Sequence, residues 1–156
     1  MTQQKYFPWA FGLSLGGTLF AGYLAGHKLF TKSCAFGESC PTFLGQPACY
    51  FGFVLFLTLA IFTAIGLATK EEAKRAMIIR STAFVSLVGV LFAGSLTLGE
   101  IIPWFTTGVK LYKMGLPTCS YGLVFFTAVF VLSALTLRKA VPAAGKTEPP
   151  AIPPKA

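Results

Sequence analysis

Charged side chains are scarce in this sequence of 156 residues: only 12% of them are Asp, Glu, Lys or Arg, whereas a water-soluble domain carries about 25%. Five residues are acidic, and His27 is the single histidine. The sequence contains no HExxH motif, no glycine-rich phosphate loop, no paired carboxylates and no serine nucleophile with a base partner. These absences leave little support for a hydrolase or a metalloenzyme, and no metal site is expected.

Long apolar runs take the place of charge. Hydrophobic residues make up 54% of the chain, and the mean hydropathy is +0.70. Four uncharged stretches can each cross a bilayer, which takes about 20 helical residues; they are 6–26, 41–69, 81–99 and 114–137. Because the bilayer core offers no water to backbone groups, these stretches must be helical. The sequence therefore predicts an all-α integral membrane protein, a four-transmembrane-helix bundle whose partner is the lipid bilayer.

The net charge of +8 is distributed unevenly. Nine basic residues lie on the side that holds both termini and the loop between the second and third stretches; the other side has Lys28, Lys32, Lys110 and Lys113. The positive-inside rule places the side with more basic residues in the cytoplasm. We therefore expect a multi-pass protein of the plasma (inner) membrane with cytoplasmic termini. The positive charge serves orientation, and no nucleic-acid partner is expected.

The sequence repeats itself. LGQPACYFGFVLF, from Leu44, returns as MGLPTCSYGLVFF, from Met114, with six of thirteen positions identical at an offset of 70. SLGGTLFAGYL, from Ser14, matches SLVGVLFAGSL, from Ser86, at eight of eleven positions and an offset of 72. This pattern predicts a membrane domain over 1–139 built from two helix-loop-helix units, 6–69 and 78–139, followed by a disordered proline-rich cytoplasmic tail over 140–156. Gly12xxxGly16 and Gly22xxxGly26 are typical of close helix packing in the first unit.

All four cysteines, Cys34, Cys40, Cys49 and Cys119, fall in or beside the two loops expected on the outer face. An even number of cysteines on an oxidising face indicates disulfide chemistry. Cys49 and Cys119 each follow a proline by two residues, which places them in the first turn of a helix. There the helix dipole and the unsatisfied amides favour a thiolate. The cysteines are therefore expected to form redox-active or structural disulfides.

The pattern C-x5-C followed by G-x-P-x4-G, namely Cys34, Cys40, Gly45, Pro47 and Gly52, resembles the vitamin K epoxide reductase family. The resemblance implies a four-helix membrane bundle that couples disulfide formation to quinone reduction and exchanges disulfides with a thioredoxin-like protein outside the cytoplasm. Cys34 and Cys40 match the family's loop pair, and Cys119 matches the second cysteine of its CxxC motif. Leu116 occupies the position of the first. Cys49, the repeat counterpart of Cys119, is then the expected partner of Cys119.

Under this hypothesis, Tyr50, Tyr121 and His27 are the candidate hydrogen-bond donors to a quinone oxygen. The alternative is a non-enzymatic scaffold or complex subunit, in which a Cys34–Cys40 disulfide staples the outer loop and a Cys49–Cys119 disulfide clamps the two repeats together. A third hypothesis, a small transporter or channel, is disfavoured because no span contains an ionisable residue in its interior.

Overall fold

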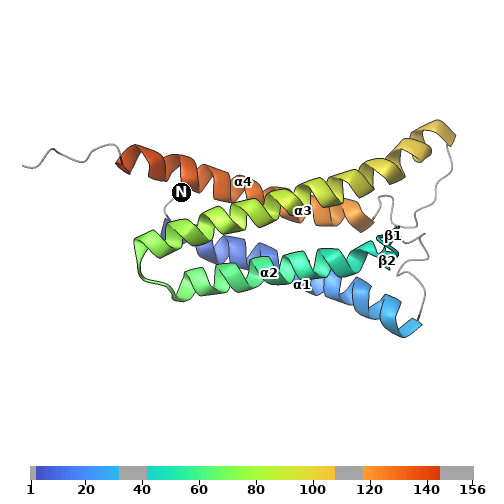
Figure 1. Ribbon diagram of the computed structural model, residues 1–156, viewed down its shortest axis with the longest axis horizontal. Coiled ribbons are helices and arrows are strands. Elements are labelled where there is room, and N and C mark those ends of the chain that lie inside the picture. The colour runs from blue at the N-terminus through green and yellow to red at the C-terminus, as the bar shows by residue number, and fades with distance from the viewer. Residues whose placement is uncertain (1–2, 32–41, 108–117, 145–156) are drawn as a thin grey trace, which may run out of the picture.

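The computed structural model describes residues 3–31, 42–107 and 118–144. Four α-helices make up nearly all of this part of the chain, which confirms the all-α class (Figure 1). They are α1 (Gln3–Thr31), α2 (Ala48–Ala68), α3 (Glu72–Thr107) and α4 (Thr118–Ala144). A hairpin of two-residue strands, β1 (Thr42–Phe43) and β2 (Gln46–Pro47), precedes α2.

Three of the described helices are long and apolar enough to cross a membrane: α2 over its whole length, α3 from Glu72 to Gly99, and α4 from Thr118 to Lys139. This finding supports a multi-pass membrane protein. The expectation of four spans is thus met for three helices. With 29 residues α1 is long enough, but its glycines and polar residues dilute its hydropathy below that of the others.

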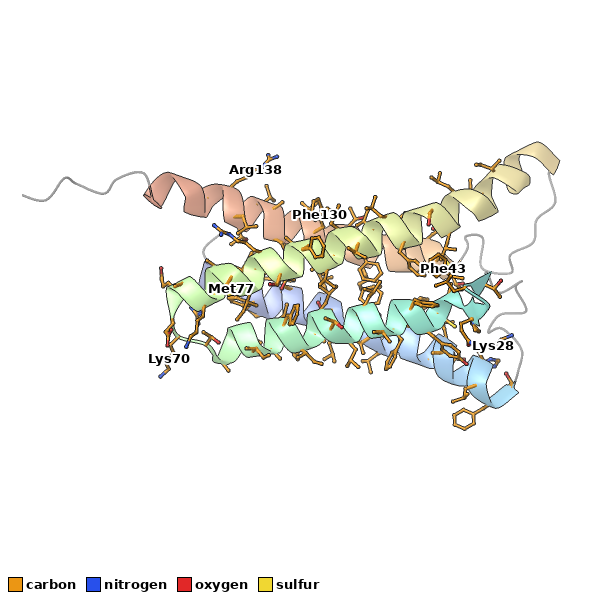
Figure 2. The ribbon with its side chains drawn as sticks, in the orientation of Figure 1. Lys28, Phe43, Lys70, Met77, Phe130 and Arg138 are labelled. Atoms are coloured by element: carbon orange, nitrogen blue, oxygen red, sulfur yellow. The ribbon has the colours of Figure 1, made fainter. Side chains whose placement is uncertain are left out.

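The helices form two antiparallel pairs, α1 with α2 and α3 with α4, which pack side by side through α2 against α3 and α1 against α4 (Figure 1). We call the end where α2 and α4 begin the cysteine end, and the end with the connector between α2 and α3 the connector end. Figure 2 labels Lys28 and Phe43 at the cysteine end, and Lys70 and Arg138 at the connector end. The N-terminus of α1 also lies at the connector end.

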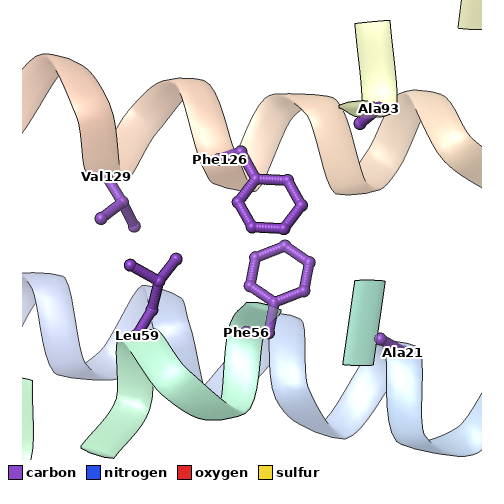
Figure 3. Close-up of a cluster of buried hydrophobic side chains, with 6 residues drawn as sticks. All are labelled: Ala21, Phe56, Leu59, Ala93, Phe126 and Val129. Carbon is purple, nitrogen blue, oxygen red and sulfur yellow. The ribbon is translucent and has the colours of Figure 1, made fainter. Parts of the chain in front are cut away.

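Two phenylalanine rings form the centre of the bundle. Phe56 of α2 and Phe126 of α4 stack face to face with their centroids 3.9 Å apart, and Leu59 lies opposite Val129 beside them (Figure 3). Gly17 of α1 lies under the Phe56 ring and Gly89 of α3 under the Phe126 ring, so close that a Cβ at either glycine would collide with the ring. The rings therefore fit only because both facing helices present a bare backbone.

Two aromatic pairs flank this centre. Phe20 of α1 meets Tyr121 of α4 at 5.9 Å between centroids and 59° between planes, and Phe92 of α3 meets Phe51 of α2 at 5.9 Å and 51°. Phe20 and Phe92 are 72 residues apart, and Phe51 and Tyr121 are 70 apart, so the two pairs correspond to each other through the offsets of the sequence repeat. Each pair joins a helix of one antiparallel pair to a helix of the other.

Hydroxyl groups occupy the core toward the connector end. Tyr6 and Ser133 share a hydrogen bond of 2.7 Å between buried oxygens on α1 and α4. Thr63, Thr82 and Ser133 also donate to carbonyl oxygens one turn earlier in their own helices. Because these hydroxyls are satisfied by their own helices, they can be buried in a membrane bundle without a large desolvation cost.

All four helices have boundaries that differ from those expected: the first covers Gln3–Thr31 rather than 6–26, and the third begins at Glu72 rather than at residue 81. The second helix begins at Ala48 rather than at residue 41, because Leu44 and Gly45 have positive φ angles of 53° and 78° and turn the chain into a hairpin. The third continues through Pro103 to Thr107; proline removes a backbone donor without always ending a helix, as Pro8 inside α1 also illustrates. The fourth extends to Ala144, past the expected boundary at residue 139, and the remaining tail lies outside the described residues.

Candidate functional site

Cys49 is the second residue of α2, directly after the N-cap Pro47 and Ala48, as the sequence predicts. Its side chain is half-buried, near the backbone N–H groups of Cys49 and Tyr50 and near the Lys28 ammonium at the end of α1. Lys28 is a neighbour of this cysteine that the sequence did not indicate.

Cys119 has the equivalent position as the second residue of α4, and it is also half-buried. In the part of the chain that the structure describes, Cys49 and Cys119 are not joined by a disulfide, so the predicted bond between them is not formed. The other two site cysteines, Cys34 and Cys40, lie outside the described residues, as does Leu116.

The spacing along α2 and α4 relates each cysteine to the central ring stack. Cys49 precedes Phe56 by seven residues and Cys119 precedes Phe126 by seven. Seven residues are close to two helical turns, so each cysteine lies on the same face of its helix as the stacked ring, about 10 Å nearer the cysteine end. Gly52 lies between Cys49 and Phe56, and a Cβ at this glycine would meet no atom within 4 Å. The interior just inside Cys49 is therefore not filled at Gly52.

The aromatic pairs at the cysteine end differ in what covers them. The ring of Phe43, in β1, lies edge-on to both Phe51 and Phe92, with centroid distances of 5.3 Å to each. Around the matching pair of Phe20 and Tyr121, the described residues place no third ring. Phe43 thus illustrates how a planar ring packs against such a pair. The pair of Phe20 and Tyr121 also has a phenol hydroxyl, that of Tyr121, two residues from Cys119 in the sequence.

A shallow apolar groove runs along α4 from this point toward the connector end. Its volume is about 650 Å³, and its described lining consists of Leu123, Val124, Thr127, Ala128, Val131 and Leu132. Leu123 follows Cys119 by one turn. On α2 the counterpart of Leu123 is Phe53, whose larger ring packs against Gly22 of α1. All six described lining residues belong to α4, so this is a wide-open apolar surface of that helix.

The other predicted ligand-binding residues have different surroundings. Tyr50 is half-buried in the first turn of α2. His27 contacts its own helix, with Nδ1 3.1 Å from the hydroxyl of Thr31 and its ring 6.2 Å from that of Tyr23. Among the described residues, no cluster of three His, Cys, Asp or Glu side chains exists that could hold a metal ion.

Several residues of the site were missed in the sequence: Phe20, Phe43, Phe51, Phe92 and Lys28. A signal for three of them existed, because Phe20 and Phe92 match at the offset of 72, and Phe51 and Tyr121 match at the offset of 70 as two aromatic residues. The contact of Phe43 with the pair on α2 and α3 had no such signal, since residue 113, its counterpart, is a lysine.

No protein-family model, no curated protein and no solved structure matches this chain. Its function therefore has to be argued from the cysteines, the aromatic pairs and the groove.

Proposed function

We propose that this protein is a membrane thiol-disulfide oxidoreductase of the vitamin K epoxide reductase type, which passes electrons from outside thiols to a membrane quinone. The observation that carries the proposal is the matched placement of Cys49 and Cys119 in the first turns of α2 and α4, each on the face that meets the central ring stack. Thiols at helix N-termini suit exchange through a mixed disulfide.

The reaction balances with the residues named. Closing one disulfide between Cys49 and Cys119 releases two electrons and two protons, and reduction of a quinone to its quinol takes up the same number. Thiolate attack from the Cys34 and Cys40 pair would then reopen the bond, and a thioredoxin-like protein would restore that pair.

The pair of Phe20 and Tyr121 is the proposed site for the quinone ring. Support comes from Phe43, which occupies the matching position against Phe51 and Phe92 as a planar ring. Tyr121 would donate a hydrogen bond to a quinone oxygen beside Cys119, and the α4 groove, whose described lining contains no charged side chain, would take the isoprenoid tail. Similar roles for Tyr50 and His27 stay predictions.

We infer as well that the two halves are copies related by a two-fold axis along the membrane normal, with α1 as a fourth span. The burial pattern supports this inference, because fully or nearly buried residues of α1 and α3 match at the offset of 72: Phe7 and Ile79, Ala10 and Thr82, Ser14 and Ser86, Ala21 and Ala93. Those of α2 and α4 match at 70: Phe56 and Phe126, Leu59 and Val129, Thr63 and Ser133. A parallel repeat of this kind places Cys49 and Cys119 at one membrane face, which the charge distribution assigns to the outside.

The alternative is a non-enzymatic four-helix scaffold or complex subunit. The observation that favours it is the core itself, in which stacked rings, glycine contacts and the hydrogen bond between Tyr6 and Ser133 join the helices without a covalent bond. Such a core needs no redox cycle to be stable.

Quinone consumption separates the two. Protein reconstituted in phospholipid vesicles with a short-tailed quinone and a reduced thioredoxin-like protein should bleach the quinone absorbance. We expect Cys119→Ser and Cys49→Ser each to abolish the bleaching, because either removes one sulfur of the pair. Ser95→Ala, which removes an exposed hydroxyl bonded to its own helix, is the matched control and should retain the full rate. The scaffold would be the better explanation if both cysteine variants still bleached the quinone. It would also be the better explanation if the unaltered protein did not bleach it.

A further inference from the structure

The hairpin before α2 contains a residue that does not suit its backbone. Thr42 pairs with Pro47 and Phe43 with Gln46, so Leu44 and Gly45 form a two-residue turn, and both have positive φ angles. Such turns prefer Asn, Asp or Gly at the first position, because a larger side chain is strained there. Leu44 is nevertheless there, and 82% of its surface is exposed. The described part of the chain therefore covers little of this side chain.

The depth of the hairpin follows from its neighbour Phe43. All 21 residues of α2 are needed to cross the hydrocarbon core, which takes about 20, so the apolar region begins near Ala48. Phe51 lies about one turn inside that boundary, and Phe43 contacts both Phe51 and Phe92 of α3. The Phe43 ring therefore lies against α2 and α3 near the start of α2, where Figure 2 labels it, and by this reckoning the hairpin reaches the edge of the apolar region.

We propose that Leu44 inserts into the acyl chains at the edge of the bilayer, and that the hairpin is a lipid anchor at the cysteine end. The six residues from Thr42 to Pro47 carry no charge, so no charged group opposes their entry into the interface. Transfer of the leucine side chain into lipid outweighs the backbone strain. The occupant is lipid, since the hairpin continues the membrane-facing surface of α2 and α3. This proposal depends on the membrane location and not on the redox function.

Replacement of Leu44 by Asn tests the proposal through the sign of its effect. Asn tolerates a positive φ. If Leu44 were strained and made no contact with lipid, the substitution would stabilise the hairpin and slow its amide hydrogen exchange. Loss of a lipid anchor predicts the reverse: for protein in phosphatidylcholine vesicles, exchange at the hairpin amides should become about tenfold faster, in line with the transfer of one leucine side chain. Slower or unchanged exchange would overturn the proposal. Exchange within α2 and α4 serves as the internal control for folding.

A depth measurement gives an independent result. Leu44→Trp in a background of Trp9→Phe and Trp104→Phe has one tryptophan, because the chain contains only these two. Its fluorescence should be quenched by phosphatidylcholine with bromine near the headgroup end of the acyl chain, and little by aqueous iodide. Lys70→Trp, at an exposed position of the connector, should show the opposite behaviour. Iodide quenching at both positions would contradict the lipid contact.

Discussion

Two glycines determine how closely the helices approach at the centre of the bundle. Gly17 and Gly89 face the rings of Phe56 and Phe126, whereas a Cβ at Gly12 or Gly26 would touch nothing within 4 Å. The Gly12xxxGly16 and Gly22xxxGly26 patterns were thus an imperfect guide, since only Gly16 and Gly22 of those four contact a neighbouring ring. The rings cannot retreat, because each is pressed against the other at 3.9 Å.

Gly17→Ala should therefore destabilise the protein by about 1–3 kcal/mol, the usual cost of overpacking a filled core. The shift in the thermal midpoint of unfolding in detergent micelles would measure this effect. Gly12→Ala is the matched control on the same helix and should stay within about 0.5 kcal/mol of the unaltered protein. Equal shifts for the two substitutions would mean that the Phe56 ring does not rest on Gly17.

At the scale of helices, α2 and α4 differ where they pack against their partners. Phe53 of α2 fills the space over Gly22 of α1, while the smaller Leu123 of α4 approaches Gly94 of α3, with 3.8 Å between its Cδ1 and a Cβ built on that glycine. Leu123 lines the groove together with Val124 and Ala128. Helices with similar sequences thus present different surfaces.

Leu123→Phe should give α4 the side chain that α2 has and occupy part of the groove. If the groove holds the tail of a quinone, we expect the KM for quinone to rise about tenfold with little change in kcat, because binding is lost without any change to the thiols. Val54→Phe, on the exposed face of α2, is the control and should alter neither constant. A fall in kcat with an unchanged KM would place the quinone elsewhere.

At the scale of the whole molecule, the two helix pairs are joined only by a short connector among the described residues. It includes an exposed ion pair of 3.0 Å between Lys74 and Glu71, and Arg75 Nε donates to the Thr69 carbonyl oxygen at 2.6 Å. Exposed ion pairs contribute little to stability. The association of the pairs therefore depends on the ring stack, the two aromatic pairs and the hydrogen bond between Tyr6 and Ser133, and not on the polar contacts of the connector.

A chain divided between Lys70 and Glu71 should consequently reassemble. We expect the two fragments, expressed together with a tag on one, to be purified from membranes as a complex, since the contacts of α2 with α3 and of α1 with α4 remain intact. Phe56→Ala in one fragment and Phe126→Ala in the other should nearly abolish recovery of the partner, because each such truncation costs about 3–5 kcal/mol in a core, which is more than a hundredfold in an association constant. If the fragments without substitutions yielded only the tagged fragment, the connector would be essential for association.

The hydropathy of the sequence was sufficient to predict four helices, three of which are long and apolar enough to cross a membrane, because a span is a local property of about 20 residues. Pro47 likewise located Cys49 in a first turn without any tertiary information. Only the tertiary structure decided that Gly17 rather than Gly12 contacts a ring, that Phe43 folds back onto α2 and α3, and that Phe20 lies beside Tyr121. A helix that is apolar on all sides shows no periodic stripe to indicate its buried face. Its rotation is set by how large rings and bare glycines fit together across helices distant in the chain.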